Sequence, residues 1–297
     1  MTKYSFKSYQ KGFEIDQARI GIEVAKNWPW PHAYSLDDLK KKYSGDFDPE
    51  TVQFCFLGNQ IIGYTSFEIF PPDEIGVTQA WLDYPRLLPG YEEAIPLLIE
   101  RAIEFMKKKG VNLIRTRVTT MWENSFEIIK QSGFVEQETY KRGAKVYYVY
   151  NLANGTINIS DFPVSECTTE EEFEKCSELA THWYYEPKDW VKTHLKENFP
   201  PEDTIAHLYV QDDNKVQAAC IIAPNELNRS IAAFYYIYSP NELYLKPLVE
   251  KAISSCIEKG YKILLVDLIR KHRGYEDFYS RIGFAKAAEW GYYEKKL

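Results

Sequence analysis

Apolar residues recur at intervals of three and four along two long segments of the chain, residues 93–109 and residues 244–259. This spacing is typical of amphipathic helices that place one face against a hydrophobic core. A glycine follows each segment, Gly110 after the first and Gly260 after the second. Glycine suits the left-handed residue that ends many helices. The pattern therefore predicts two long helices, each with a defined C-terminal end.

The two predicted helices belong to a longer repeat. The apolar positions before Gly110 match those before Gly260 at a separation of 150 residues, and Gly133–Phe134 matches Gly283–Phe284 at the same separation. This period is about half of the 297-residue chain, so it indicates two copies of one domain and not a stacked array of short units. We expect a first domain, a linker and a second domain at residues 1–152, 153–160 and 161–297.

Strand and helix patterns alternate in the first half. Val52–Leu57 and Ile61–Phe70 are expected to form a hairpin, and Val77–Tyr84 a third strand. The helix at 93–109 then leads to Asn112–Val118, which makes this strand a parallel neighbour of the third. The other expected elements are a helix over Leu39–Tyr43 with a capping box at Ser35 and Asp38, a short helix over Ser125–Gln131, and closing antiparallel strands at Phe134–Tyr140 and Lys145–Asn151.

The second half repeats this order. Thr168-x-x-Glu171 is expected to cap its first helix, which runs to about Trp183. The later elements are a hairpin, two parallel strands on either side of the long helix, a short helix and a closing strand, at Thr204–Val210, Val216–Ala223, Ile231–Tyr238, Lys262–Ile269, Tyr275–Arg281 and Phe284–Glu294. The chain is therefore predicted to be an α/β protein with a mixed (α+β) sheet in each of two domains.

Composition narrows the class of protein. The net charge of −7 argues against general nucleic-acid binding. No apolar run reaches the roughly 20 residues that a membrane span needs, and residues 1–17 lack the apolar core of a signal peptide. The five cysteines are scattered without a CxxC pair or a Cys/His cluster in the sequence. We therefore expect a cytoplasmic, reduced protein without a metal site and without nucleic-acid or membrane partners.

Two motifs occur in the same order in both halves. One is a strand, a proline, a loop and the long helix, from Trp81–Pro85 to Gly110 and from Tyr236–Pro240 to Gly260. The other is the short helix that ends in Gly-Phe. Together they resemble the GNAT superfamily of acyl-CoA-dependent N-acyltransferases over essentially the whole chain, as two tandem GNAT-like domains. The resemblance implies transfer of an acetyl or related acyl group from acetyl-CoA, or another acyl-CoA, to a small-molecule or peptide amine, without a metal.

The resemblance also implies where acyl-CoA binds. In the superfamily, backbone N–H groups at the start of the long helix hold the pyrophosphate. The positions that match here are Gly90, Tyr91, Glu92, Glu93 and Ala94, with Arg86 as a leading basic residue and Lys246 in the second half. Both loops depart from the superfamily's glycine-rich pattern. Glu92 and Glu93 place negative charge where phosphate would lie, although they suit a bare helix N-terminus. The second loop has no glycine, and Pro247 removes a donor.

The implied catalytic residues divide between the halves. The superfamily's thiolate-protonating tyrosine stands four residues before the glycine of Gly-Phe, which is Tyr279 in the second half and Ile129 in the first. Isoleucine has no proton to donate. Asp83 and Asp267 are the candidate bases, each with a surface or ion-paired carboxylate as the alternative interpretation. Neither half therefore holds the full set of residues.

Two aromatic segments, residues 28–32 and 183–185, occupy equivalent places in the two halves. In the superfamily this region helps form the wall of the acceptor site, and an aromatic wall suits a small-molecule pocket. Packing between the domains explains the same residues equally well. Two functions follow from the sequence: a tandem GNAT-like acyltransferase, or a catalytically inactive GNAT-fold protein that binds a small ligand or a partner.

Overall fold

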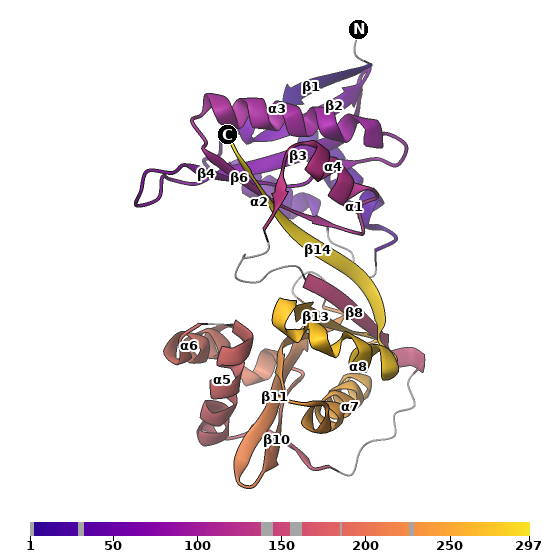
Figure 1. The fold of residues 1–297 in the computed structure, drawn as a ribbon. Coiled ribbons are helices and arrows are strands. Elements are labelled where there is room, and N and C mark those ends of the chain that lie inside the picture. The colour runs from indigo at the N-terminus through magenta and orange to yellow at the C-terminus, as the bar shows by residue number, and fades with distance from the viewer. Residues whose placement is uncertain (1–2, 29–32, 138–144, 155–161, 185, 226–228) are drawn as a thin grey trace. The chain divides into compact units, whose positions relative to one another are not determined.

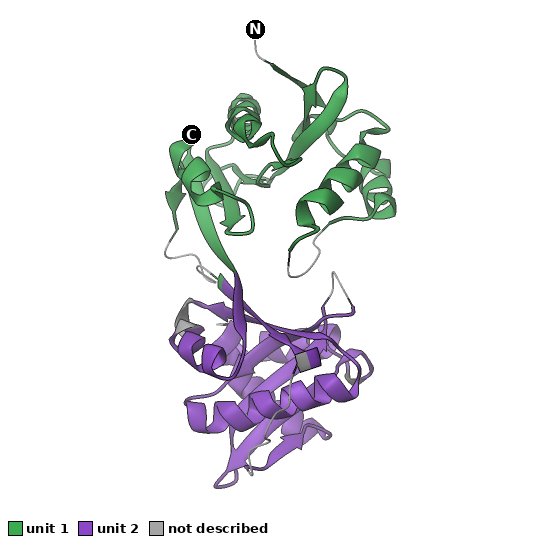
Figure 2. Cartoon of the chain, turned by 90° about the vertical axis from the view of Figure 1, so that its right-hand side faces the viewer, with its two compact units in different colours: residues 1–145, 288–297 green, residues 146–287 purple. Residues whose placement is uncertain are grey.

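The computed structural model describes residues 3–28, 33–137, 145–154, 162–184, 186–225 and 229–297. The chain forms two compact units (Figure 2). Unit 1 comprises Met1–Lys145 and Ala288–Leu297, and unit 2 comprises Val146–Ala287. Among the described residues, no helix has the length and apolar character that crossing a bilayer requires.

Unit 1 is built on a mixed sheet. Its strand order is β1 (Tyr4–Ser8), β2 (Val52–Leu57), β3 (Gln60–Ile69), β4 (Gln79–Leu82), β6 (Leu113–Thr119) and β14 (Ala285–Lys296), as Figure 1 labels them. Within this order only β4 and β6 are parallel, as the sequence predicted. Off this path, β5 (Arg86–Leu87) pairs with β3, and β7 (Val135–Glu136) pairs with β14. Its helices are α1 (Phe13–Ala25), α2 (Leu36–Ser44), α3 (Ile95–Lys108) and α4 (Ser125–Gln131), with short 3-10 turns at Pro49–Thr51 and Glu92–Ala94.

The sheet of unit 1 is covered on both faces because its strands alternate. In β2, Phe54 and Phe56 pack with Ile20 of α1, whereas Cys55 between them belongs to the core cluster of α3. Successive side chains of a strand point to opposite faces, so one strand supplies both clusters. The α3 stripe that the sequence predicted is buried, with Leu98 and Ile99 fully inaccessible to solvent.

β4 and β6 separate beyond Leu82. The last parallel pair is Leu82 and Thr116, while β6 continues to Thr119 along β14. The chain after β4 instead forms β5 (Arg86–Leu87), which pairs with β3 at Gly63 and Tyr64. Gly63 permits this approach, because a Cβ at that position would lie 2.4 Å from Cγ of Leu87. The parallel pair therefore opens where the sequence had predicted one uninterrupted strand from Val77 to Tyr84.

The last strand of the chain completes the sheet of unit 1. Trp290–Lys296 of β14 pair antiparallel with Leu113–Thr119 of β6, and Tyr293 is buried in the core cluster of α3. Conversely, the side chains of Val146, Tyr148 and Tyr150 in β8 (Lys145–Asn151) lie in the core of unit 2. The prediction that Phe284–Glu294 closes the second domain and Lys145–Asn151 the first is therefore wrong. The two halves share one strand pattern, so the local sequence cannot say which sheet each closing strand joins.

Unit 2 repeats the architecture. Its strand order is β8, β13 (Ile263–Ile269), β12 (Ala232–Tyr238), β11 (Lys215–Pro224), β10 (Ala206–Asp212) and β9 (Val164–Glu166), with β12 and β13 parallel as predicted. Its helices are α5 (Glu170–Tyr184), α6 (Lys188–Asn198), α7 (Glu242–Glu258) and α8 (Glu276–Arg281), with 3-10 turns at Leu152–Asn154, Pro201–Asp203 and Arg270–Tyr275. The predicted α/β class with a mixed sheet is confirmed in each unit.

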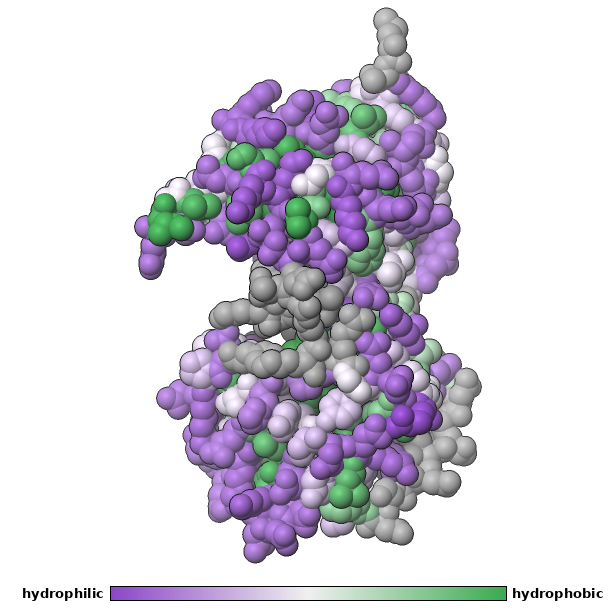
Figure 3. Space-filling model, viewed as in Figure 1, coloured by the Kyte–Doolittle hydropathy of each residue, from purple (hydrophilic) through white to green (hydrophobic). Residues whose placement is uncertain are grey.

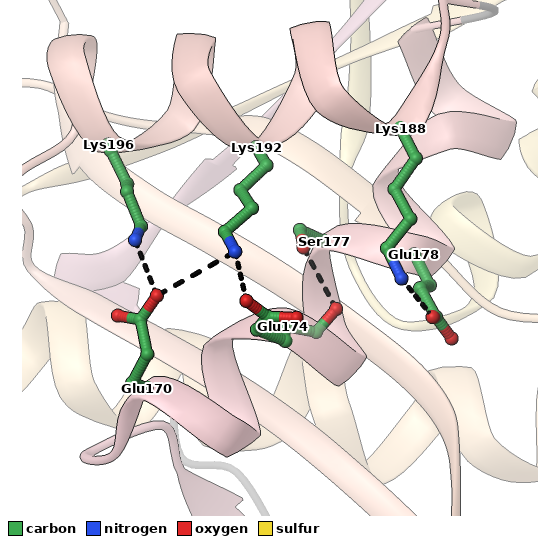
Figure 4. Close-up of polar contacts among 7 residues, drawn as sticks. All are labelled: Glu170, Glu174, Ser177, Glu178, Lys188, Lys192 and Lys196. Carbon is green, nitrogen blue, oxygen red and sulfur yellow. Dashed lines mark hydrogen bonds and ion pairs between the residues drawn. The ribbon is translucent and has the colours of Figure 1, made fainter.

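Ion pairs join α6 to α5 in unit 2. Lys188, Lys192 and Lys196 on one face of α6 contact Glu178, Glu174 and Glu170 on the facing side of α5 (Figure 4). Both sets repeat every four residues, and one helical turn brings such residues to the same face. All six side chains are partly exposed to solvent, so each of these ion pairs contributes little to the free energy of unfolding. Their main effect is on the register of α5 and α6.

The N-terminal caps of two helices can be compared with the sequence prediction. The capping box of Ser35 and Asp38 is present as predicted. In the second half the cap lies one residue later than predicted: the hydroxyl of Thr169 accepts from the N–H of Glu172, and that carboxylate accepts from the N–H groups of Thr168 and Thr169. The strands β1 and β9 and the helices α1 and α6 were not predicted. Residues 138–140 of a predicted strand and residues 155–160 of the predicted linker lie outside the described residues.

The face of the molecule in Figure 3 is mainly hydrophilic. Large exposed apolar side chains among the described residues are scattered over different elements, such as Ile75 in the loop after β3, Val135 in β7 and Leu243 in α7. Single exposed apolar residues are normal on soluble domains. A functional site is therefore better sought in the cavities of each unit.

We expect Gly63→Ala to destabilise unit 1 by about 1–3 kcal/mol, because the added methyl group must displace Leu87 and with it β5. Gly21→Ala on α1 is the control, since a Cβ there meets its nearest atom at 3.4 Å and alanine favours helix. Chemical denaturation measures the free energy of unfolding of each variant, and hydrogen exchange measures the protection of the β3 peptide. Equal protection of that peptide in Gly63→Ala and the natural protein would contradict this account of β5.

Removing residues 288–297 is expected to unfold unit 1 selectively, because β6 then loses its antiparallel partner and Tyr293 leaves the core. Limited proteolysis with mass spectrometry gives the readout: cleavage within residues 3–137 should precede cleavage within 162–287. Removal of Leu297 alone is the control. Simultaneous cleavage of both units in the truncated chain would contradict the assignment of this strand to unit 1.

Candidate functional site

A pocket in unit 1 lies where β4 and β6 separate. Its cavity volume is about 70 Å³. Residues from both diverging strands, from α1 and α2 and from the end of the chain line it: Gln17, Trp28, Tyr34, Lys42, Tyr64, Thr65, Ser66, Asp83, Tyr84, Arg86, Arg117, Trp122 and Trp290. Of the sequence-predicted site residues, the pocket brings together Asp83 and Arg86.

Aromatic rings form much of the pocket wall. Trp122 is the centre of the group: its ring stacks on Tyr84 with centroids 5.0 Å apart and meets Trp28 and Trp290 edge-on at 5.7 and 5.5 Å. Such stacked and edge-on pairs contribute more than their buried area alone. Of the predicted aromatic segment, Trp28 belongs to this wall, and residues 29–32 lie outside the described residues.

Asp83 is held with its carboxylate at the pocket. The hydroxyl of Ser66 donates to Oδ2 of Asp83 at 2.7 Å, and the hydroxyl of Thr65 donates to its backbone carbonyl at the same distance. Its N–H donates to the carbonyl of Ser66 at 2.8 Å. The residue stands just beyond the last parallel pair, where β4 leaves β6. The carboxylate is thus oriented by the neighbouring strand β3 while it stays exposed to solvent.

Three cations line the same pocket as Asp83. Nζ of Lys42 lies 5.8 Å from the ring centroid of Tyr34. The guanidinium carbon of Arg117 lies 4.8 Å from the ring centroid of Trp290. Arg86 stands beside Tyr64: burial raises the pKa of that phenol, and the guanidinium opposes part of the rise. The lining therefore carries three positive charges and one negative charge, in a chain whose net charge is −7.

Two polar atoms in the wall are buried without a partner. Tyr84 is 3% exposed, and neither its hydroxyl nor Nε1 of Trp122 has a hydrogen-bond partner among the described residues. Burial raises the pKa of the Tyr84 phenol, so the group keeps its proton at neutral pH. An unpaired buried donor costs roughly 1–3 kcal/mol. Such donors at a cavity are typical of a binding site whose ligand completes them.

The predicted pyrophosphate loop of unit 1 binds its own carboxylates. The N–H of Gly90 donates to both oxygens of Glu92, at 2.9 and 3.0 Å. Glu93 accepts from the Tyr4 hydroxyl and from Lys3, at 3.3 Å for the lysine, and the tyrosine bond is the main cause of its lowered pKa. Tyr91 and Ala94 belong to the turn and the 3-10 helix before α3. Arg86 stands on β5 and lines the pocket.

In the second half, Tyr279 and Asp267 interact electrostatically, whereas Lys246 lies on α7. Tyr279 is 1% exposed in the aromatic core, and burial raises its pKa far above the ordinary value, with Asp267 on β13 adding to the rise. Lys246 lies 3.8 Å from Glu250 on the next turn of α7. The side chain of Asn241 caps α7 by accepting from the N–H of Tyr244 at 3.3 Å, so one of the donors that would meet phosphate is used.

The fold of unit 2 gathers three residues that are scattered in the sequence. The thiols of Cys167 and Cys176 and a ring nitrogen of His207 lie within 4.8 Å of one another. The pKa of Cys167 falls to about 5, mainly through the Cys176 thiol and secondly through His207. Nε2 of His207 lies 2.9 Å from the Tyr236 hydroxyl, which fixes the ring. The sequence contains no Cys/His cluster, and the fold brings these three residues together.

Sequence reasoning missed Tyr84, Trp122, Arg117 and Trp290 as pocket residues. Tyr84 stands within the strand-proline motif, so its place next to Pro85 was an available signal. Trp290 carried no local signal, because it reaches the pocket through the pairing of β14 with β6. Ile129, the counterpart of Tyr279, is fully buried in the core of unit 1 and supplies no donor.

Comparison with known proteins yields structural matches alone: no protein-family model and no curated protein sequence matches the chain. A GCN5-related N-acetyltransferase from Sphaerobacter thermophilus matches with a TM-score of 0.66 at 10% identity, covering 100% of this chain and 96% of that one. A tandem GNAT protein from the clavulanic acid biosynthesis pathway matches with a TM-score of 0.61 at 13% identity, covering 99% and 98%.

A GNAT-family acetyltransferase from Colwellia psychrerythraea is similar in the same way, with a TM-score of 0.57 at 12% identity over 98% of this chain and 100% of that one. Identities this low establish a shared fold and leave the reaction open. Over essentially its whole length, the chain has the fold of the GNAT acetyltransferases, in the tandem arrangement that its sequence repeat predicted.

Proposed function

We propose that the chain is an N-acyltransferase that moves an acyl group from acyl-CoA to an amine, and that the reaction takes place in the pocket of unit 1. The observation that carries the proposal is the position of Asp83, a carboxylate oriented by Ser66 at the point where two parallel strands separate. The GNAT fold supports this reaction class by analogy with the acetyltransferases that share it. Acetyl-CoA is the first donor to test.

The proposed step uses one base. Asp83 takes a proton from the ammonium form of the acceptor, and the freed lone pair of the nitrogen attacks the carbonyl carbon of the thioester. A C–N bond forms and the C–S bond breaks. The nitrogen then loses its second proton to give the amide, and the leaving thiolate of CoA takes up a proton in return. General bases positioned in this way typically contribute roughly 10²–10⁴-fold to the rate.

Tyr84 supports the same step as a hydrogen-bond donor. Its phenol is buried and protonated at the wall of the pocket, and no described residue forms a hydrogen bond with it. A fixed donor in a low-dielectric site stabilises charge that develops in the transition state. In unit 1, Ile129 occupies the position of the superfamily's tyrosine and has no hydroxyl. The hydroxyl of Tyr84 would supply that function by stabilising the carbonyl oxygen or the leaving thiolate.

The acyl donor would bind at the start of α3. There the phosphates must replace Glu92 at the N–H of Gly90, so binding competes with an internal cap. Arg86 then serves the acceptor pocket, where it stands beside Tyr64, and not the phosphates. In unit 2, the Asn241 cap and the burial of Tyr279 favour a structural role.

A second candidate function is a catalytically inactive GNAT-fold protein that binds a small ligand. The self-capped loop of unit 1 favours it, because Glu92 and Glu93 oppose phosphate at the helix N-terminus. Binding of acetyl-CoA distinguishes the two functions. A donor present at 100 times its Kd raises the free energy of unfolding by about 2.7 kcal/mol, which a thermal shift detects.

Asp83→Asn is expected to lower kcat/KM by roughly 10²–10⁴, because the amide keeps the shape of the carboxylate and cannot take the proton. Release of the CoA thiol, followed with a thiol reagent over a panel of amines, measures the rate. Asp46→Asn, an exposed aspartate outside the pocket, is the matched control. Full activity in Asp83→Asn would exclude unit 1 as proposed.

Tyr279→Phe tests the other half in the same assay. If unit 1 is the active one, the loss of this hydroxyl should change kcat by less than about twofold, since the tyrosine is core packing. A loss of roughly 10²–10⁴ in Tyr279→Phe, with activity retained in Asp83→Asn, would move the reaction to unit 2.

Glu92→Gln is expected to tighten acetyl-CoA binding by up to about tenfold, because it removes a negative charge from the anion site and weakens the cap on Gly90. Isothermal calorimetry with the full chain measures the Kd. Glu104→Gln, exposed further along α3, controls for net charge. An unchanged Kd in Glu92→Gln would show that acetyl-CoA binds away from the start of α3. No binding to either protein at millimolar acetyl-CoA would show that it is not a ligand of the chain.

A further inference from the structure

The charges around the pocket of unit 1 are arranged for a ligand that carries both signs. Asp83 supplies one negative charge, and Lys42, Arg86 and Arg117 supply three positive ones. Among the described residues, Lys42 and Arg117 form no ion pair and instead lie over aromatic rings. Like charges that converge on one small cavity repel each other, so an anionic group in the cavity relieves that repulsion.

The unpartnered atoms of the wall point to the same anionic group. Nε1 of Trp122 can only donate a hydrogen bond, and the hydroxyl of Tyr84 is 97% buried without an acceptor among the described residues. Both therefore need oxygen atoms from a ligand. Two donors beside arginine side chains suit a carboxylate, which accepts several hydrogen bonds through its two oxygens.

The aromatic rings of the pocket suit the amine and the aliphatic part of such a ligand. Tyr84, Trp122 and Trp290 form a continuous aromatic surface next to the carboxylate of Asp83. A primary ammonium group is stabilised by ring faces and by a carboxylate, and the aliphatic part of a ligand packs on the same rings. The cavity volume of about 70 Å³ holds a small group and no folded partner.

We propose that the acceptor is a small zwitterion of the amino-acid class, whose amine lies at Asp83 and whose carboxylate is bound by Arg117 and Arg86 with the donors of Trp122 and Tyr84. This inference rests on the proposed acyl transfer for the role of the amine, and on the pocket alone for the binding of the carboxylate. The charge at each end of the ligand then sets the orientation that brings the amine to the diverging strands.

Matched sets of compounds test the inference on the full chain. Each set contains an amino acid, its amide and the corresponding simple amine: alanine, alaninamide and ethylamine; leucine, leucinamide and 3-methylbutylamine; phenylalanine, phenylalaninamide and phenethylamine. Calorimetry measures binding without any reaction, and release of the CoA thiol measures transfer from acetyl-CoA. In at least one set, the amino acid should bind roughly tenfold or more tightly than its amide, the size expected for one charge-assisted contact.

Three variants identify the source of that preference. Arg117→Gln should reduce the preference for the amino acid over its amide to less than about threefold, and Lys130→Gln, an exposed lysine on α4, should preserve it. Trp122→Phe keeps an aromatic ring and removes the N–H donor, so it should weaken binding of the amino acid more than binding of its amide and reduce the preference between them. This third variant keeps the test decisive if Arg117→Gln does not fold.

The outcomes separate this inference from the proposed reaction. Preference for the amino acid without any transfer from acetyl-CoA would support the zwitterion site and reject the acyltransferase. Transfer to amines without such a preference would support the acyltransferase and overturn the zwitterion site. A preference that persists unchanged in Arg117→Gln and Trp122→Phe, or failure of every compound to bind at millimolar concentration, would also overturn it.

Discussion

The separation of β4 and β6 is the constraint on which the candidate site depends. Two parallel strands pair through Leu82 and Thr116, and beyond that point β5 turns to pair with β3 across Gly63. A side chain at residue 63 would collide with Leu87 and keep the chain from turning. Without the turn, Asp83 would continue the parallel ladder, and no cavity would open between the strands.

Electrostatics distinguishes two regions of unit 1. The pocket carries an excess of positive charge, and in its wall the Tyr84 hydroxyl and Nε1 of Trp122 have no hydrogen-bond partner among the described residues. The start of α3 has its donors occupied by Glu92, whose carboxylate serves the helix dipole in place of a phosphate. On the proposed function, an acyl donor must displace Glu92 from the N–H of Gly90, whereas among the described residues of the acceptor pocket the hydroxyl of Tyr84 and Nε1 of Trp122 have no partner to displace. We therefore expect a strong preference for the acceptor and a weak one for the donor.

Much of the fold could be predicted from the sequence, because it depends on local periodicity. The stripe of α3, the hairpin of β2 and β3 and the parallel pairs of both units follow from spacing that repeats at 150 residues. Less of the site could be predicted. Asp83 was a candidate because it stands in a recognisable strand-proline motif. Trp122 and Arg117 were missed as pocket residues because their place at the pocket depends on neighbours far away in the chain.

By itself, the sequence determined the duplication, the α/β class and the order of elements in each half, since these depend on contacts between residues close in the chain. Only the tertiary structure decided that Trp290 closes a pocket of unit 1 and that Tyr148 packs in unit 2. It also brought Cys167 to His207. The physical reason is that both halves offer the same strand pattern and the same open sheet edge. The choice between two such edges is made by side-chain packing across the finished core, which no local pattern encodes.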